Sequence, residues 1–175
     1  MTGAEIRQAL KDRFADQIVA DNEARDMDTV SIKVEALKAV ALFLRDVPSL
    51  KMDMLTDLTA IDWHRQRSDR YDLVALFYST SLQHRIRVKA AIPEKVAEFD
   101  SLTEVYAVAN WLEREVFDMF GLKAKGHPNL RRILTHEEFE GYPLRKDYPV
   151  NRRQPIRPPV TDLLTLKPYK GKGAN

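Results

Sequence analysis

Apolar residues in the first third of the chain change their spacing twice. Between residues 4 and 14 they recur every four positions, which is the spacing of one face of an amphipathic helix. Residues 29–34 instead alternate apolar and polar side chains, which predicts a strand with one buried face. From residue 35 the helical intervals return, and they last until Pro48 ends the pattern. The sequence therefore predicts a helix, a strand and a second helix in this order.

The middle of the chain carries three strand candidates, at residues 54–63, 71–78 and 84–91. In the last of these, apolar residues alternate with charged ones, as in a strand that buries one face. The charged stretch 64–70 separates the first two candidates and predicts a hairpin loop. Because sequential strands with short links favour neighbouring positions in a sheet, we expect an antiparallel meander.

A longer helix is predicted over residues 102–120, where apolar side chains again recur at helical spacing. Gly121 follows at the position where a helix often needs a left-handed residue to end. Together the elements predict an α+β fold, a two-layer sandwich of a mostly antiparallel sheet with helices on one face. This folded domain is expected to span residues 1–121.

The chain after Gly121 has no regular pattern. Six of the nine prolines lie between Pro143 and Pro168, and the fixed φ and missing N–H of proline exclude a helix or a central strand there. Residues 122–175 are therefore predicted to form an extended C-terminal arm. The arm is too rich in apolar residues for a solvated linker, so we expect it to lie on its own sheet or on a partner. Beyond Val150, proline and positive charge predict that it becomes ordered only on a partner.

Composition is that of an ordinary globular protein, with 44% hydrophobic and 31% charged residues among 175. No apolar run approaches the ~18 residues of a membrane span, and the first residues are too charged for a secretory signal. A cytoplasmic location is expected. The net charge is only +2, but the residues from Asn151 onward carry six cations and one anion, so the basic excess lies in the tail.

Several kinds of catalytic or cofactor site are excluded by what the sequence lacks. There is no cysteine, which removes disulfides, thiol catalysis and the usual ligands of iron–sulfur clusters. No glycine-rich loop follows a strand and no serine-hydrolase elbow occurs, so neither a nucleotide cradle nor that nucleophile is predicted. His136 to Glu140 resembles the start of a zinc-protease helix but lacks its second histidine.

Four histidines remain as candidates for metal binding or proton transfer. Three stand at positions that are ordinarily solvated: His64, His84 and His136. His127 differs, because Gly126 and Pro128 fix the backbone on either side of it. No second catalytic group is spaced to serve it, so a structural hydrogen bond or a partner contact is favoured over catalysis.

Two blocks of the sequence resemble one known family. The stronger block runs without gaps from Asn110 to Pro149. It contains Glu113-Arg114-Glu115, Phe117-Asp118-Met119-Phe120-Gly121, Gly126-His127-Pro128, Arg132-Ile133-Leu134 and Pro143-Leu144-Arg145-Lys146-Asp147. The weaker block is residues 57–62. On these motifs the chain is identified as a member of the thirty-kilodalton subunit family of complex I, the proton-translocating NADH:quinone oxidoreductase, in its bacterial form.

The resemblance implies a structural subunit without enzyme activity of its own. The C-terminal arm of such a subunit runs over the large quinone-site subunit of the peripheral arm of the complex, beside the subunits that carry the clusters. The family member binds no cofactor itself, while NADH, FMN, iron–sulfur clusters and quinone act in the assembled complex. It is expected at the cytoplasmic face of the bacterial inner membrane, as a peripheral protein that meets the membrane only through the complex.

The charged motifs are interpreted as a partner interface, because closely packed charges among aromatic residues are typical of polar-rimmed interfaces. The predicted interface residues are Glu113, Arg114, Glu115, Phe117, Asp118, Phe120, Gly126, His127, Pro128, Arg131, Arg132, Pro143, Leu144, Arg145, Lys146 and Asp147. The alternative is that these are solvated surface pairs worth roughly 0.2 to 0.5 kcal/mol each. The forked guanidinium groups of Arg131, Arg132 and Arg145 suit carboxylates on a neighbouring subunit, and Arg145 is expected to pair with acidic groups of the large subunit.

Two other functions fit parts of the sequence. Membrane-bound hydrogenases and other quinone-linked dehydrogenases contain an equivalent subunit, so the electron donor stays open. A module that binds nucleic acid through the basic tail would show a strong dependence on salt. That function ranks lower because the basic residues lack an aromatic platform, and no nucleic-acid partner is expected.

Overall fold

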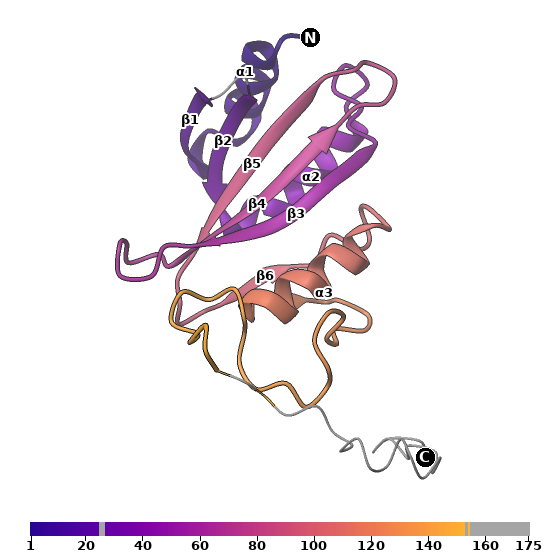
Figure 1. The fold of residues 1–175 in the computed structure, drawn as a ribbon. Helices are drawn as coiled ribbons and strands as arrows, with labels where there is room; N and C mark the ends of the chain where they lie inside the picture. Colours follow the sequence, from indigo (N-terminus) through magenta and orange to yellow (C-terminus); the bar gives the residue numbers. More distant parts are fainter. Residues whose placement is uncertain (25–26, 153, 155–175) are drawn as a thin grey trace.

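A computed structural model describes residues 1–24, 27–152 and 154 of the chain (Figure 1). Its helices are α1 (Gly3–Phe14), α2 (Leu37–Asp46) and α3 (Ala109–Phe120), with short 3₁₀ turns at Ala15–Gln17 and Val34–Ala36. Its strands are β1 (Ile18–Ala24), β2 (Met27–Lys33), β3 (Met54–Asp62), β4 (Tyr71–Tyr78), β5 (Arg85–Ile92), β6 (Glu98–Asp100) and β7 (Lys123–Lys125). Each helix and strand predicted between residues 4 and 91 corresponds to one of these elements.

The larger sheet of the described residues has five strands in the order β1-β2-β5-β4-β3. β3, β4 and β5 form the predicted antiparallel meander, and β1 pairs antiparallel with β2. β2 and β5 are parallel, with Val30 opposite Val88, so the sheet is mostly antiparallel. The sequence pattern does not predict β1, because this edge strand is largely exposed and its apolar residues do not alternate.

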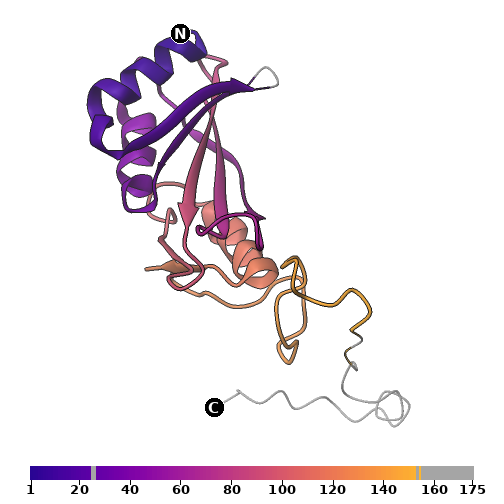
Figure 2. The same cartoon turned by 90° about the vertical axis from the view of Figure 1, so that its left-hand side faces the viewer.

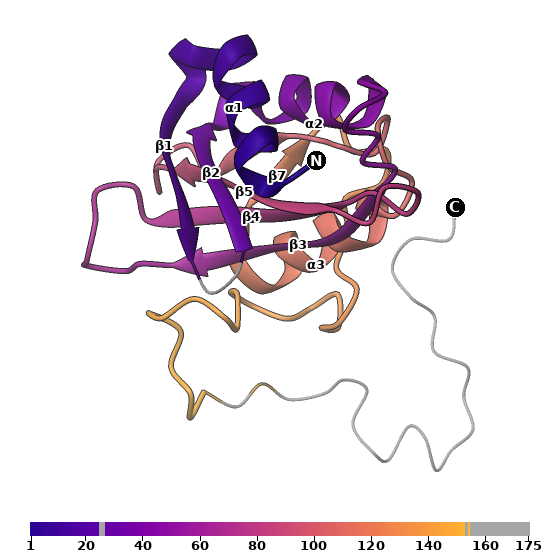
Figure 3. The ribbon, with the colours of Figure 1, turned by 90° about the horizontal axis from the view of Figure 1, so that it is seen from above.

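One face of this sheet is covered by α1 and α2 (Figures 2 and 3). α1 begins with a capping box, in which Thr2 Oγ1 accepts from the Glu5 N–H and the Glu5 carboxylate accepts from the Thr2 N–H. Its apolar residues Ile6 and Leu10 are fully buried against the sheet, and α2 buries four residues at helical spacing. The predicted α+β sandwich with helices on one face is confirmed.

α3 packs against β3 at the lower end of the sheet in Figure 1, and it is shorter than predicted. Residues 102–108 form tight turns instead of the first part of the helix. One turn brings Tyr106 into the core, where its hydroxyl donates to the Met52 carbonyl at 2.8 Å. The Leu102 N–H donates to the Glu113 carboxylate at 2.6 Å, which ties this turn to α3. The predicted helix is therefore correct only from Ala109 onward.

Gly121 ends α3 as predicted, with φ at 76° in the left-handed region. A Cβ at this position would lie 2.5 Å from the Tyr142 ring and 2.6 Å from the Arg145 guanidinium, so glycine is also needed for close packing. Immediately beyond it, Leu122 and Ala124 are buried, and β7 pairs in parallel with β6. The folded core thus continues past Gly121 into the segment expected to be an extended arm.

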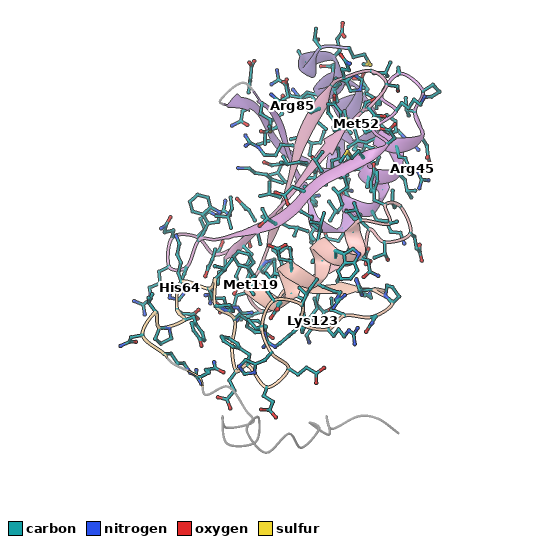
Figure 4. The ribbon with its side chains drawn as sticks, turned by 45° about the vertical axis from the view of Figure 1, so that its right-hand side comes forward. Arg45, Met52, His64, Arg85, Met119 and Lys123 are labelled. Atoms are coloured by element: carbon teal, nitrogen blue, oxygen red, sulfur yellow. The ribbon has the colours of Figure 1, made fainter. Side chains whose placement is uncertain are left out.

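The described residues after β7 contain no further helix or strand. They fold back below α3 (Figure 1), toward the end of the molecule where Figure 4 shows His64, Met119 and Lys123. Arg45, Met52 and Arg85 lie at the opposite, upper end. The expected ordering of the chain beyond Val150 falls almost entirely on residues outside the described ranges.

Candidate functional site

The C-terminal arm returns to the domain at the last turn of α3. The final carbonyl groups of a helix have no partner within the helix, and they form the negative end of its dipole. The three successive carbonyls of residues 118–120 each accept a hydrogen bond from the arm. The donors are Arg132 Nη1 at 3.3 Å, the Leu144 N–H at 3.1 Å and Arg145 Nε. Two of the donors also bring positive charge to this negative end.

Asp118, on the same turn, is the first buried anchor of the arm. Its side chain is 0% exposed. One carboxylate oxygen accepts the consecutive N–H groups of Ile133, Leu134 and Thr135 at 2.7–3.0 Å. The other oxygen accepts from Arg132 Nη1 at 2.7 Å and from the Thr135 hydroxyl. Burial alone would raise the pKa of this carboxyl, but the hydrogen bonds outweigh it and hold the pKa of Asp118 at about 2.

A second buried anchor lies at the end of β3. Arg70 donates to both oxygens of Asp62 at 2.9 Å, a bidentate pair whose side chains are 4% and 1% exposed. Arg70 also reaches Glu94 and, at 2.7 Å, Asp147 of the arm. The Lys146 N–H donates to Asp62 at 2.8 Å. Burial opposes ionisation of Asp62, but the bonds from Arg70 and Lys146 lower its pKa to about 2.

Arginine and aromatic side chains alternate between these two anchors. Guanidinium groups lie over rings at 4.4–5.8 Å in the pairs Arg70–Tyr71, Arg145–Tyr71, Arg145–Tyr142, Arg132–Tyr142, Arg132–Phe139 and Arg152–Tyr148. Phe117 of α3 meets Tyr142 edge-on, with ring centroids 6.2 Å apart. Cation–π contacts are worth about 0.5 to 1 kcal/mol each at exposed sites. Together these contacts further stabilise the packing of the arm against α3 and β4.

The anchors determine how the stability depends on pH. Both Asp62 and Asp118 have a folded-state pKa of about 2, below the pKa of a free aspartate. Each carboxylate therefore stabilises the folded state in full when the pH is above the pKa of a free aspartate. This stabilisation is lost as the pH falls through the folded pKa. We expect the arm to stay bound down to about pH 4 and to detach at lower pH, with roughly 2 kcal/mol lost per carboxylate.

Amide hydrogen exchange of residues 130–148, measured at stepwise lower pH, checks this expectation. Glu113 acts in the opposite direction, because burial raises its pKa and so favours the folded state in acid. Helix α1 provides the internal control, because neither Asp62 nor Asp118 forms a hydrogen bond with it. The amide protection of α1 should therefore not depend on either aspartate. Loss of protection in the arm already near pH 6 would contradict the assignment of the two aspartates as anchors.

Glu113 and His127 hold the first half of α3 to the turns beside it. Glu113 is 0% exposed and accepts from Ser101 Oγ at 2.7 Å. His127 Nδ1 accepts from the Asn129 N–H at 2.9 Å, which assigns the ring proton to Nε2, and this nitrogen lies 3.1 Å from the Asn110 carbonyl. His127 thus makes structural hydrogen bonds, one of the two roles favoured for it from the sequence.

His84 is not the solvated residue that its place at a strand edge predicts. Its side chain is 8% exposed, and Nε2 lies 2.6 Å from the Leu50 carbonyl. The prediction is wrong because the loop that holds Leu50 folds over this end of the sheet, a contact between residues 34 positions apart. Of the other two, His64 is half-buried and His136 is exposed.

The predicted interface residues divide by burial. Four of them are buried in the chain itself: Glu113, Arg114, Asp118 and Phe120. Burial corrects the prediction for Glu113 and Asp118, whose side chains have no exposed surface with which to contact a partner. Arg114 donates to the carbonyls of Arg131 and Arg132 at 3.1 and 3.3 Å, and it lies over the ring of Trp111. Arg114, Asp118 and the Phe120 carbonyl thus hold the C-terminal arm, while Glu113 holds the turn at Ser101 and Leu102.

The remaining predicted residues are exposed or half-buried: Glu115, Phe117, Gly126, His127, Pro128, Arg131, Arg132, Pro143, Leu144, Arg145, Lys146 and Asp147. Arg132 and Arg145 already use their guanidinium groups within the chain, on Asp118 and on the Phe120 carbonyl. Arg132 therefore already has a carboxylate partner within the chain, whereas Arg145 forms no ion pair among the described residues, and its pairing with acidic groups of a partner stays a prediction. Arg131 is exposed and makes no ion pair among the described residues.

Two exposed apolar residues of this region were not among the predictions. Trp111 is 59% exposed and Leu134 is 64% exposed, and Leu144, which was predicted, is 53% exposed. The sequence placed Trp111 among the aromatic residues around the charged motif, but a tryptophan on an amphipathic helix is ordinarily assigned to the core. We refer to Trp111, Glu115, Arg131, Leu134 and Leu144 as the arm surface.

The arm also carries a shallow hollow of about 190 Å³, lined in part by Tyr142, Tyr148 and Arg152. The part of the chain that the structure describes contains no group of three or more His, Cys, Asp or Glu side chains able to hold a metal ion. No helix in that part is long and apolar enough to cross a membrane.

One protein family, described as the 30 Kd subunit of respiratory-chain NADH dehydrogenase, has a sequence profile that matches residues 30–154. The chain belongs to this family. The matched span runs from β2 to the end of the described arm, so it includes both Asp62 and Asp118. The family resemblance noted in the motifs is confirmed.

Curated relatives of this 30 Kd family member come from several bacteria, and each is the NADH-quinone oxidoreductase subunit designated by the letter C. The chain is 41% identical to that of Trichlorobacter lovleyi over 165 residues, which cover 94% of either protein. It is 50% identical to that of Rhodobacter capsulatus over 121 residues, which cover 69% of this chain and 60% of the relative.

Solved structures of similar fold come from two sources. A trypsin-resistant fragment of Nqo5 gives a TM-score of 0.62 at 25% identity, over 74% of this 30 Kd family chain and 100% of the fragment. A chain of the membrane-bound sulfane sulfur reductase, an archaeal respiratory membrane complex, gives a TM-score of 0.69 over 85% of this chain and 86% of that one. At 22% identity the second likeness shows a shared fold.

Proposed function

We propose that the chain is a cofactor-free structural subunit of the peripheral arm of a proton-translocating NADH:quinone oxidoreductase. In this role it supports assembly with the large quinone-site subunit and stands beside the cluster-carrying subunits. NADH, FMN, iron–sulfur clusters and quinone are bound elsewhere in the complex. Its place is the cytoplasmic face of the bacterial inner membrane, where it is attached through the complex.

The observation that carries the proposal is the arm surface. Asp118 and the Arg70–Asp62 pair hold an irregular segment in one conformation, so little ordering entropy remains to be lost when a partner binds. On this preorganised segment and the adjoining helix, Trp111, Leu134 and Leu144 are each more than half exposed. Apolar anchors among charged residues are the usual composition of a protein interface.

The cofactor-free part of the proposal rests on residue chemistry. The sequence has no cysteine for an iron–sulfur cluster. The buried oxygens of Asp118 and Asp62 accept N–H groups from the arm, so ligation of a metal by either carboxylate would detach the arm from its anchor. Structural use and metal binding therefore exclude each other at these positions.

The double substitution L134D/L144D tests the arm surface. Both side chains point to solvent, so the isolated variant should melt like the wild type. In the complex, charge placed on two apolar anchors should weaken association by about 2 kcal/mol or more, which is a loss of about 30-fold in affinity. The measurement is the amount of tagged full-length chain that co-purifies with the membrane-associated oxidoreductase, together with NADH:quinone activity.

The matched control is V19D/L82D, which adds the same charge at two exposed apolar residues far from the arm, 69% and 44% exposed. It should be retained like the wild type. Equal retention of L134D/L144D and the control would refute the arm surface as the contact. A wild-type chain found in no oxidoreductase complex would refute the proposed function as a whole.

A further inference from the structure

The outer face of the five-stranded sheet, opposite α1 and α2, is covered by no described helix (Figure 2). In β2, β3, β4 and β5 the alternate residues belong to the core, so their neighbours point to this outer face. The outer-face residues of the three central strands are Thr29, Ser31 and Lys33 on β2, Arg85, Arg87, Lys89 and Ala91 on β5, and Asp72, Val74, Leu76 and Tyr78 on β4. Asp57, Thr59 and Ile61 of β3 extend the face at its edge.

An apolar stripe runs along the middle of this outer face. Val74 is only 7% exposed although it lies outside the main core, and Leu76, Tyr78 and Ile61 are half-buried. Val74 stands opposite Thr59 on one side and Lys89 on the other. Side chains of the neighbouring strands therefore flank the stripe at Val74.

A basic column borders the stripe on the β5 side. Arg85, Arg87 and Lys89 alternate along β5, and side chains two positions apart on a strand are about 7 Å from each other, so their charges repel. Arg87 Nε donates to Thr29 Oγ1 at 2.9 Å. Among the described residues, none of these three cations forms an ion pair with a carboxylate. Arg7, Arg70 and Arg132, in contrast, each meet an aspartate.

The other border of the stripe carries negative charge. Asp57 stands opposite Leu76 and forms no ion pair among the described residues, whereas Asp72, next to Ile61 of β3, is buried and already paired with Arg67 and Trp63. The face thus carries three cations on the β5 side, and on the other side Asp57 is the carboxylate that no described cation neutralises. A phosphate backbone laid across it would meet the carboxylate of Asp57 and the apolar stripe, whereas a protein segment can place carboxylates on the basic side and apolar side chains on the stripe.

We propose that the outer face is a second docking surface, for a protein segment that lays apolar side chains on the Val74–Leu76 stripe and acidic side chains on Arg85, Arg87 and Lys89. Such a segment neutralises charges that repel one another in the free chain, and it covers the apolar surface of Leu76 and Tyr78 that the described chain leaves partly exposed. The surface is separate from the arm surface, because Arg85 marks the upper end of the molecule and the arm its lower end (Figure 4). The proposal rests on the assembly of the chain into a complex.

The first test reverses the column with R87E/K89E. The control K51E/K95E reverses two exposed lysines in turns outside this face. Both full-length variants should fold with the wild-type melting temperature. Retention of R87E/K89E in the purified complex at moderate salt should fall at least about tenfold, and the control should be retained like the wild type, because like charges across an interface are strongly unfavourable. Equal retention of the two variants overturns the proposal.

The second test works even if charge reversal unfolds the chain. A photo-reactive amino acid at Leu76 is irradiated in the intact complex, and the cross-linked peptides are sequenced. A cross-link to a partner peptide rich in aspartate and glutamate is expected. No cross-link, a cross-link to a peptide without acidic residues, or one to nucleic acid overturns the second docking surface. In each of these cases, a cross-link from a photo-reactive residue at Leu134 to a subunit of the complex would still support the proposed function.

Discussion

Replacing Arg70 with methionine should lower the melting temperature of the isolated chain by about 10 °C. Removing one partner of a buried ion pair costs about 3 to 5 kcal/mol, and each kcal/mol is worth about 2 to 4 °C in a domain of this size. Asp62, whose side chain is 1% exposed, would keep the N–H groups of His64 and Lys146 but lose its bidentate partner. Asp147 of the arm would lose its partner as well.

The matched control is Arg67→Met in the same loop. Arg67 also pairs with an aspartate, but its side chain is 42% exposed, so its loss should cost less than about 1 kcal/mol. The double variant R70M/D62L should regain part of the lost stability, because it removes both buried charges together. Melting followed by circular dichroism measures all three. A change for R70M no larger than that for R67M would show that the pair is not an anchor.

Asp118→Asn should release the C-terminal arm from α3 while most of the sheet stays folded. An asparagine has one acceptor oxygen in place of two, and its amide N–H₂ would face either the three backbone N–H groups or Arg132. Leaving buried donors unsatisfied next to an unpaired guanidinium should cost about 3 to 5 kcal/mol. Amide exchange of residues 133–135 should accelerate strongly, and the melting temperature should fall by about 10 °C.

Glu115→Gln is the control on the same helix, since Glu115 is exposed and should change stability by no more than about 0.5 kcal/mol. Protection of β4 and β5 serves as an internal reference in both variants. If residues 133–135 stay protected in D118N, the arm is held by its arginine–aromatic contacts alone. Loss of protection across the whole sheet would instead mean that the arm and the sheet unfold as one unit.

The charged motif around α3 makes contacts within the chain. Sequence reasoning assigned Asp118, Arg132 and Arg145 to a partner, yet all three act between α3 and the arm. We therefore propose that exposed apolar residues such as Leu134 and Leu144 make the partner contact of this region. In this region charged residues are buried and several apolar residues are exposed. Residue composition does not predict this arrangement.

Much of the fold follows from local patterns. The periods of apolar residues predicted α1, α2 and four strands of the larger sheet, because burial of one face imposes a period of about 3.6 on a helix and of 2 on a strand. Gly121 was predicted to end α3, since few other residues adopt its positive φ without strain. The family followed from contiguous motifs, whose residue order does not depend on knowing what they contact.

The prediction from apolar periodicity was wrong where the burial of side chains did not follow the period of the secondary structure. β1 is an exposed edge strand, and the turns at residues 102–108 keep helical spacing because Tyr106 and its neighbours pack on a core built by other elements. In both cases the contacts that determine the local structure come from other segments of the chain. The same holds for His84, whose partner Leu50 lies in a separate loop.

By itself, the sequence determined the class of the fold, the family and the lack of cysteine ligands, because these depend on residue identity and on spacing along the chain. Only the tertiary structure decided which charged residues are buried, and so which of them could face a partner. Asp62 and Lys146 meet across 84 positions of the chain, and Arg70 and Asp147 across 77. A hydrogen bond between such distant residues depends on where the fold brings the backbone, and no period or motif in either segment encodes that distance.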